Sequence, residues 1–416
     1  MHIEAIVHHK IVSVIQQIKE LLESDFPSDS PKKALNTLLT FFDSYHGTLS
    51  RALQSNNERI LLAAATTINQ RIYQYLPVIG FLQRSTDVIN SFEYFYSLRE
   101  ITKTYVGANA DIVISSEWDY SPLTYGLSVG ALPNCVLMGL PVSESSNVLI
   151  IPLVGHELGH TVWHQEKIAI KMQPDIQKMV EIEIFNRSNE FKIAFPHHKD
   201  LNITKAEISQ NLFIVTIIAD IMMLCMRQVE EIFCDAFGAE LFGIGFLKAF
   251  RYLLAPNLGG ARTFDYPTLI NRAKFLRDYS KNEKSTFMLN YVSSFAEIPT
   301  NLTAVDKFLS ETADTVAIHF ASKLYEESHN IASKDVTHLP NNANARLIKT
   351  HFDKGVPPNN PMRLSDIINA AWEFADEKFE VFDVKDQKRH EFNWISQVAF
   401  KAIEILEYNQ RTSNNA

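Results

Sequence analysis

The sequence predicts a mostly α-helical protein that also contains a small β-sheet. Apolar residues recur at helical spacing over most of the 416 residues, beginning with a stripe over residues 3–25. The stretch from 107 to 154 instead shows short apolar and β-branched runs separated by glycine and proline. Hydrophobic residues make up 46% of the chain and charged residues 21%, which is typical of a soluble globular protein. A chain of this length can bury one large core or form two to three ordinary domains.

The first hundred residues show a series of helical patterns. After the stripe at 3–25, Pro27 and Pro31 interrupt the pattern, and Ser30-Pro31 is a suitable helix start. Further patterns run over residues 32–54, 57–83 and 86–105. We therefore predict an N-terminal helical region over residues 1–106.

The next stretch is predicted to form short strands. Its β-like runs are residues 111–115, 135–140 and 148–151. Trp118, Asp119 and Tyr120 follow the first run and are candidates to line a cleft.

The sequence H-E-x-x-H follows the last of these runs, in a helix predicted over residues 152–170. His156 and His160 are four residues apart and share a helix face, so both imidazoles can bind one metal ion. Glu157 can reach a water in the open position of that metal, which is the arrangement of a zinc hydrolase. The alternative is an amphipathic helix whose histidines are ordinary core or surface residues. His164, one turn later, is expected to be exposed or to support the ligands.

After a helix predicted to open at Pro174 and to run over 174–192, helices resume from 206 to 253 and include a second acidic motif. Glu231 and Asp235 are four residues apart among apolar neighbours, where unpaired carboxylates would be costly. Glu231 is the predicted third metal ligand, and Asp235 is predicted to accept a hydrogen bond from a ligand histidine. Glu230 is the competing ligand, but position 234, four residues later, is a cysteine. The alternative is a pair of surface acids on an amphipathic helix.

The remaining C-terminal sequence is also predicted to be helical. Its patterns run over residues 302–333, 363–380 and 388–408.

Composition excludes several classes of protein. A net charge of −9, with no basic stripe, argues against a nucleic-acid partner. The three cysteines show neither a zinc spacing nor a disulfide framework, which suits a reducing cytoplasm. The first residues lack the features of a signal peptide. The apolar run at 212–226 contains Asp220 and is shorter than the roughly 20 residues of a membrane span, so we expect a buried helix and no transmembrane segment.

The two motifs together resemble the signature of the gluzincin zinc metallopeptidases, H-E-x-x-H followed by E-x-x-x-D. The gap from His160 to Glu231 is 71 residues (231 − 160), which is closest to soluble relatives of the CAAX prenyl endopeptidase group. The resemblance covers residues 148–272. It implies a zincin-like catalytic core in which zinc is held by His156, His160 and Glu231, with Glu157 as general base. It also implies a small sheet beside the zinc helix, whose edge strand can bind an extended peptide, although a purely structural sheet is equally compatible.

A third element of that group is His-Pro followed by an arginine six residues after the histidine. Here Tyr266-Pro267 and Arg272 have this spacing, with tyrosine in place of histidine. A phenol can also donate a hydrogen bond to a developing oxyanion, which makes Tyr266 and Arg272 candidate catalytic residues. The alternative is a helix entry at Tyr266-Pro267 with Arg272 in a structural ion pair.

The predicted architecture is therefore a zincin-like core over 107–290, flanked by helical regions over 1–106 and 291–416. The predicted function is zinc-dependent hydrolysis of peptide bonds in a peptide or protein substrate. One alternative is a zinc-binding regulatory or scaffold protein with weak or lost activity, favoured by tyrosine at position 266. A deformylase-type hydrolase would need a cysteine ligand, and Cys135 lacks the expected surrounding motif. Nothing in the sequence indicates the oligomeric state.

Overall fold

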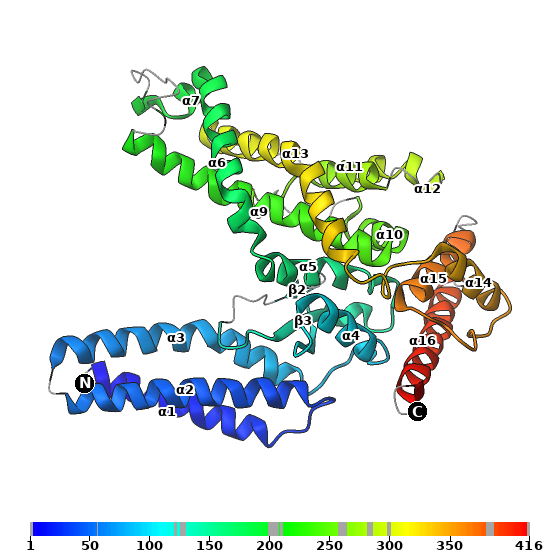
Figure 1. Cartoon of the computed structure of the whole chain (residues 1–416), viewed down its shortest axis with the longest axis horizontal. Helices are drawn as coiled ribbons and strands as arrows, with labels where there is room; N and C mark the ends of the chain where they lie inside the picture. The colour runs from blue at the N-terminus through cyan, green and yellow to red at the C-terminus, as the bar shows by residue number, and fades with distance from the viewer. Residues whose placement is uncertain are drawn as a thin grey trace. The chain divides into compact units, whose positions relative to one another are not determined.

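The structure is a computed structural model, mostly helical, that forms two compact units, Met1–Ser146 and Asn147–Ala416 (Figure 1). The residues that it describes are 3–55, 57–119, 123–124, 130–198, 208, 211–256, 264–280, 286–297, 301–379 and 387–413. Tyr120, expected beside Trp118 and Asp119 in a cleft, lies outside these residues. The three-part division predicted from the sequence stays a prediction.

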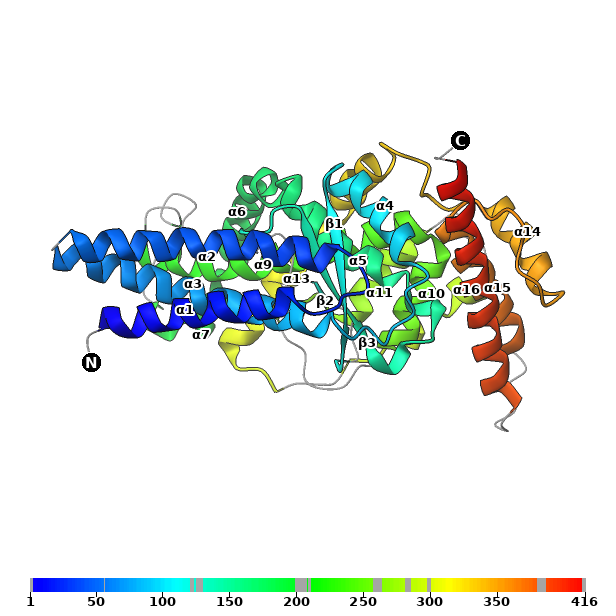
Figure 2. The same ribbon diagram turned by 90° about the horizontal axis from the view of Figure 1, so that it is seen from below.

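Three long helices of unit 1 lie side by side (Figure 2). They are α1 (Ile3–Leu22), α2 (Ser30–Gln54) and α3 (Glu58–Arg84). Their inward faces carry almost fully buried apolar side chains at helical spacing, among them Ile11, Ile18, Leu35, Phe42 and Ile68. These burials explain the pattern, because a stripe of 3.6-residue period can face one core. The three helices predicted here are confirmed.

The fourth helix of unit 1, α4 (Phe95–Val106), is shorter than the predicted 86–105. The segment before it is held by a side chain instead of by helical hydrogen bonds. The backbone N–H groups of Ile89 and Asn90 donate to Ser116 Oγ, at 2.8 and 3.1 Å. These two amides are therefore satisfied outside a helix.

Unit 1 also contains a three-stranded sheet in the order β1-β3-β2. β1 (Asp111–Glu117) pairs in parallel with β3 (Cys135–Pro141), and β2 (Leu123–Thr124) pairs antiparallel with β3. The predicted strands at 111–115 and 135–140 are confirmed. The third predicted run is wrong, because Val148–Ile150 is a short 3₁₀ helix, η2, of unit 2. The Asn147 side chain accepts a hydrogen bond from the Leu149 N–H and so caps this helix.

The central helix of unit 2 is α9 (Leu212–Phe242). Before it come α5 (Leu153–Gln165), α6 (Ile168–Asn186) and α7 (Ser188–Ala194). α5 is the helix predicted over 152–170, and it ends five residues earlier than predicted, at Gln165. Pro174 was predicted to open a helix and instead lies inside α6. A helix can tolerate a proline at the loss of one backbone hydrogen bond when its other residues pack well.

α9 is a single helix of 31 residues that contains both the apolar run at 212–226 and the acidic motif. Its C-terminal half is almost wholly buried, whereas Leu212, Phe213 and Met223 in its N-terminal half are exposed. The prediction that the apolar run is buried is therefore correct for one face only. By length and composition α9 is able to cross a membrane, a test that core helices of soluble proteins also pass. The expected absence of a transmembrane segment stays a prediction.

The chain turns after α9 at Gly243, whose φ of 58° favours glycine, and continues in helices to its C-terminal part. These helices are α10 (Ile244–Leu254), α11 (Leu269–Tyr279), α12 (Thr286–Leu289), α13 (Ala304–Ala332), α14 (Asn342–Phe352), α15 (Leu364–Phe379) and α16 (Gln387–Ser413). The described chain also contains short 3₁₀ helices, η1 (Val142–Glu144) and η3 (Pro196–His198) before α9 and η4 (Val292–Ser294) after it. The three predicted C-terminal helices are confirmed, and α14 was missed. α5, α6, α10, α11, α13 and α15 pack against α9, and α15 also packs against α10.

Candidate metal centre

Two glycines allow α5 to lie very close to α9. A Cβ atom on Gly155 would lie 2.9 Å from Cα of Gly238, and one on Gly159 would lie 2.8 Å from Cα of Cys234. Since residue numbers increase along α5 while those of the contacts on α9 decrease, the two helices run antiparallel. This close approach places the H-E-x-x-H face of α5 directly on the acidic motif of α9.

The three predicted metal ligands meet at this contact. His156 Nε2 lies 3.4 Å from Glu231 Oε2, and His160 Nε2 lies 3.6 Å from Glu231 Oε1. The three groups offer ligand atoms that all lie within 4.8 Å of one another. Two ligands at about 2.0–2.1 Å from a tetrahedral zinc ion are roughly 3.3 Å apart, close to the observed separations. The group formed by His156, His160 and Glu231 could therefore hold a metal ion.

The carboxylate of Glu231 provides a test of this fit. Glu231 is 7% exposed. Its Oε2 atom is buried and accepts no hydrogen bond from the described part of the chain, with His156 Nε2 and Arg272 Nη2 each 3.4 Å away. A buried acceptor without a hydrogen bond is costly. A cation between Glu231 and the two imidazoles would remove this cost, so the donor set fits a metal.

Two carboxylates of α9 contact Nδ1 of the two histidines, which is the ring nitrogen that does not face Glu231. His156 Nδ1 lies 2.9 Å from Asp235 Oδ1, and His160 Nδ1 lies 2.9 Å from Glu230 Oε1. Each ring therefore has one nitrogen on a carboxylate and Nε2 directed at Glu231. The contact of Asp235 agrees with its predicted supporting role. The contact of Glu230 is not predicted by the sequence, because it depends on the register of α5 against α9.

Electrostatics around His156 favour positive charge at its ring. Burial lowers the pKa of His156, but the hydrogen bond with Asp235 and the carboxylate of Glu231 outweigh burial and raise the pKa to about 10. Carboxylates that favour a proton on the ring favour a metal cation for the same reason, because both are positive charges.

Glu157, the predicted general base, is 9% exposed and lies on α5 between the two histidines. Burial raises the pKa of its carboxyl, and the negative charge of Glu231 adds to this effect, while His156 and His160 oppose it. A carboxylate with a raised pKa is a stronger base than an exposed one, which suits proton transfer near neutral pH.

Arg272 is a buried partner of Asp235. Its Nε and Nη2 atoms donate to the two carboxylate oxygens of Asp235, at 2.8 and 2.7 Å. Its Nη2 also lies 3.4 Å from Glu231 Oε2, and its guanidinium lies 4.9 Å from the centre of the Phe250 ring. The ion pair considered as the alternative role of Arg272 is therefore present. A role for Arg272 in stabilising a transition state stays a prediction.

Tyr266 lies beside this arginine, just before α11. Its ring centre is 5.8 Å from the guanidinium carbon of Arg272, and its side chain is 46% exposed. The negative charge of Glu231, followed by burial, raises the pKa of its phenol. The Thr268 side chain caps α11 by accepting from the Asn271 N–H, which fixes the start of the helix that carries Arg272. Tyr266 is therefore near the carboxylates of the centre, whereas its catalytic role stays a prediction.

His164 stands outside the group of ligands. Its Nε2 lies 3.5 Å from Glu230 Oε1, and its side chain is 44% exposed. This placement agrees with the expected exposed or supporting position.

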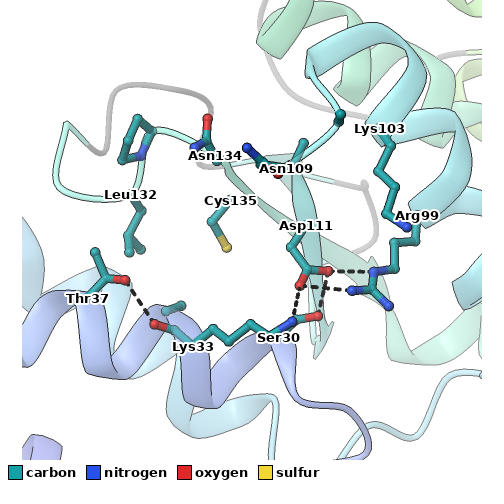
Figure 3. A pocket seen from close by; sticks show the side chains of 14 residues that line it. Ser30, Lys33, Thr37, Arg99, Lys103, Asn109, Asp111, Leu132, Asn134 and Cys135 are labelled. Atoms are coloured by element: carbon teal, nitrogen blue, oxygen red, sulfur yellow. Dashed lines mark hydrogen bonds and ion pairs between the residues drawn. The ribbon is translucent and has the colours of Figure 1, made fainter.

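Unit 1 contains a pocket of about 440 Å³ between α2, α4 and the starts of β1 and β3 (Figure 3). Asp111 lines the pocket and accepts hydrogen bonds from Ser30 Oγ at 2.7 Å and Lys33 Nζ at 3.4 Å. Arg99 Nε lies 2.9 Å from Asp111 Oδ1. These contacts join α2, α4 and β1, so the charged groups named here stabilise the fold of unit 1.

Cys135 also lines this pocket. Burial, together with the negative charge of Asp111, raises the pKa of its thiol to about 12. A thiol that stays protonated at neutral pH is a poor nucleophile and a poor metal ligand. Cys135 therefore gives no support to a deformylase-type site.

Comparisons of the chain with protein families, curated proteins and solved structures found no match. The chemistry that the centre can perform therefore depends on its own donors. These are two imidazoles and one carboxylate around a common point, two further carboxylates behind the imidazoles, and one buried carboxylate beside them. This group could hold a metal ion.

Proposed function

We propose that this protein is a zinc-dependent peptidase of the gluzincin type. The observation that carries the proposal is the convergence of His156 Nε2, His160 Nε2 and a buried Glu231 oxygen that accepts no hydrogen bond. Two histidines and one glutamate form a ligand set of catalytic zinc sites, which leave a fourth position for water. Imidazole ligands favour zinc and other first-row transition metals over magnesium and calcium, which prefer oxygen ligands.

The residues of the chain then have distinct roles in hydrolysis. A bound zinc ion would polarise the scissile carbonyl and lower the pKa of a bound water. Glu157 accepts the proton of the attacking water and delivers it to the amine that leaves, so its own protonation state is restored. Arg272 keeps Asp235 ionised and in place behind His156. Tyr266 donates its phenol hydrogen to the developing oxyanion.

The proposal is tested by incubating the purified protein, loaded with zinc, with a mixture of peptides of varied sequence. New termini are then identified by mass spectrometry. We expect cleavage that a chelator abolishes and that added zinc restores. The matched control is Glu157→Gln, which should bind zinc and leave the peptides intact. A wild-type protein that holds zinc and cleaves no peptide in the mixture would contradict the proposed activity.

That last outcome would favour a zinc-binding regulatory or scaffold protein with a peptidase-like arrangement. A specific observation supports this second candidate. Arg272 donates both Nε and Nη2 to Asp235 in an ion pair. Position 266 carries tyrosine, where the corresponding element of the CAAX prenyl endopeptidase group has histidine. Zinc would then stabilise the contact between α5 and α9 without turnover.

A further inference from the structure

We infer that Glu230 is a positioning residue that holds the His160 ring so that Nε2 faces the metal. This inference rests on the metal site of the proposed function and goes beyond it, because it assigns a second orienting carboxylate. The signature of the two motifs contains only one such carboxylate, Asp235.

The two histidines have matching surroundings. Each Nδ1 lies 2.9 Å from a carboxylate oxygen of α9, which belongs to Asp235 for His156 and to Glu230 for His160. Each Nε2 lies near one oxygen of Glu231, at 3.4 and 3.6 Å. If Asp235 orients His156, the same geometry assigns the same role to Glu230 at His160.

The contact also decides between the two possible roles of Glu230. Its Oε1 lies against Nδ1 of His160, which is the ring nitrogen directed away from Glu231. A metal bound by the two Nε2 atoms and Glu231 therefore lies on the other side of the ring. Glu230 is then a partner of a ligand, whereas Glu231 is the ligand.

An imidazole needs such a partner because its two nitrogens are chemically similar. The neutral ring carries one proton, and either nitrogen can hold it. A carboxylate that accepts the Nδ1–H fixes the proton there, leaves the Nε2 lone pair for the metal, and makes the ring a more basic ligand. It also prevents the ring from rotating about its side-chain bonds.

The burial of Glu230 agrees with this role. The residue is 5% exposed, and its charge has two further partners, Arg227 Nη1 at 3.5 Å from Oε2 and His164 Nε2 at 3.5 Å from Oε1. Both partners are more distant than His160 and are largely exposed. The shortest contact of this buried carboxylate is therefore the one to the ligand ring.

The test compares Glu230→Ala and Glu230→Gln with the wild type in zinc affinity, measured by competition with a chromophoric chelator. Glu240→Ala is the matched control, because Glu240 lies on the same helix and contacts His329 Nδ1 at 2.9 Å, outside the metal group. We expect Glu230→Ala to weaken zinc binding about 10- to 100-fold. Glu230→Gln, which keeps an oxygen acceptor, should weaken binding less, and Glu240→Ala should leave it unchanged.

A second measurement needs no variant that might alter folding. In wild-type protein labelled with ¹⁵N-histidine and loaded with zinc, NMR should show His160 protonated at Nδ1 and metal-bound at Nε2. Zinc bound through Nδ1 of His160, or equal zinc affinity of Glu230→Ala and Glu240→Ala, would overturn the inference and leave the proposed function standing. A wild type that binds no zinc would overturn both.

Discussion

At the scale of single residues, the buried carboxylates of the centre outnumber the positively charged side chains that the described residues place among them. Glu157, Glu230, Glu231 and Asp235 are each at most 9% exposed, whereas the cations among them are Arg272 and His156, the pKa of which is raised to about 10. Burying like charges together is unfavourable unless a positive charge compensates. A divalent cation bound by Glu231 and the two histidines would supply that charge. Metal binding and the stability of this region are therefore linked.

Glu157→Gln should remove the proposed general base and retain the metal. General-base catalysis contributes roughly 10²- to 10⁴-fold in rate, so kcat should fall by a factor in that range. Zinc content per chain should stay equal to that of the wild type, because Glu157 is not among the three ligands. Steady-state cleavage and metal analysis measure the two quantities. Full turnover by the variant would show that another group takes the proton.

Asp235→Ala should affect both metal binding and stability. Loss of the hydrogen bond to His156 should weaken zinc about 10- to 100-fold. The variant also leaves the buried Arg272 guanidinium without its partner, and an unpaired buried charge typically costs about 3–5 kcal/mol. Chelator competition and urea unfolding measure these effects. Unchanged zinc affinity would refute the orienting role of Asp235.

Tyr266→Phe separates a catalytic phenol from a structural one. Removal of one donor to an oxyanion costs about 2.7–4 kcal/mol of transition-state stabilisation, so kcat should fall roughly 10²- to 10³-fold. Zinc content and melting temperature should hardly change, since the side chain is 46% exposed. Arg272→Ala is the comparison and should chiefly lower the free energy of unfolding. Wild-type kinetics in Tyr266→Phe would favour a structural role for the whole element.

At the scale of elements, the close approach of α5 to α9 decides whether the ligands can meet. The contact is backbone to backbone at Gly155 and Gly159, so it leaves no space for a methyl group. A side chain at either position should push the helices apart and move His156 and His160 away from Glu231.

Gly159→Ala should therefore destabilise the protein and weaken zinc binding together. Overpacking of a tight contact typically costs 1–3 kcal/mol, about the range expected in urea unfolding. Gly47→Ala in α2 is the control, because a Cβ atom there would meet only the end of the Arg51 side chain at 3.9 Å. That control should be neutral or more stable by up to about 1 kcal/mol. Equal stability of the two variants would show that the close contact is not required.

At the scale of the whole molecule, the chain forms two compact units, and all three proposed ligands belong to Asn147–Ala416. Unit 1 has its own hydrophobic core, formed by α1, α2 and α3 together with residues of the sheet such as Val113 and Leu137. A ligand that binds only the folded form of one unit stabilises that unit by mass action.

Zinc removal should consequently act on one unit. At a free zinc concentration 100 times its Kd, binding stabilises by about 2.7 kcal/mol. Hydrogen exchange followed by mass spectrometry should show faster exchange in α5 and α9 after chelation. Exchange in α1, α2 and α3 should stay the same. An equal response in both units would contradict the assignment of the ligands to unit 2.

The sequence by itself predicted the helical class, the strands at 111–115 and 135–140, and a metal group of His156 and His160 with Glu231 preferred to Glu230 as third ligand. These features are local, since a period of 3.6 residues and an i, i+4 spacing are properties of one segment. Tertiary structure decided which of two adjacent glutamates faces the metal group, that Arg272 pairs with Asp235, and that 148–150 is a helix. These outcomes depend on the register of α5 against α9 and on which backbone groups find a partner, and neither can be read from one segment alone.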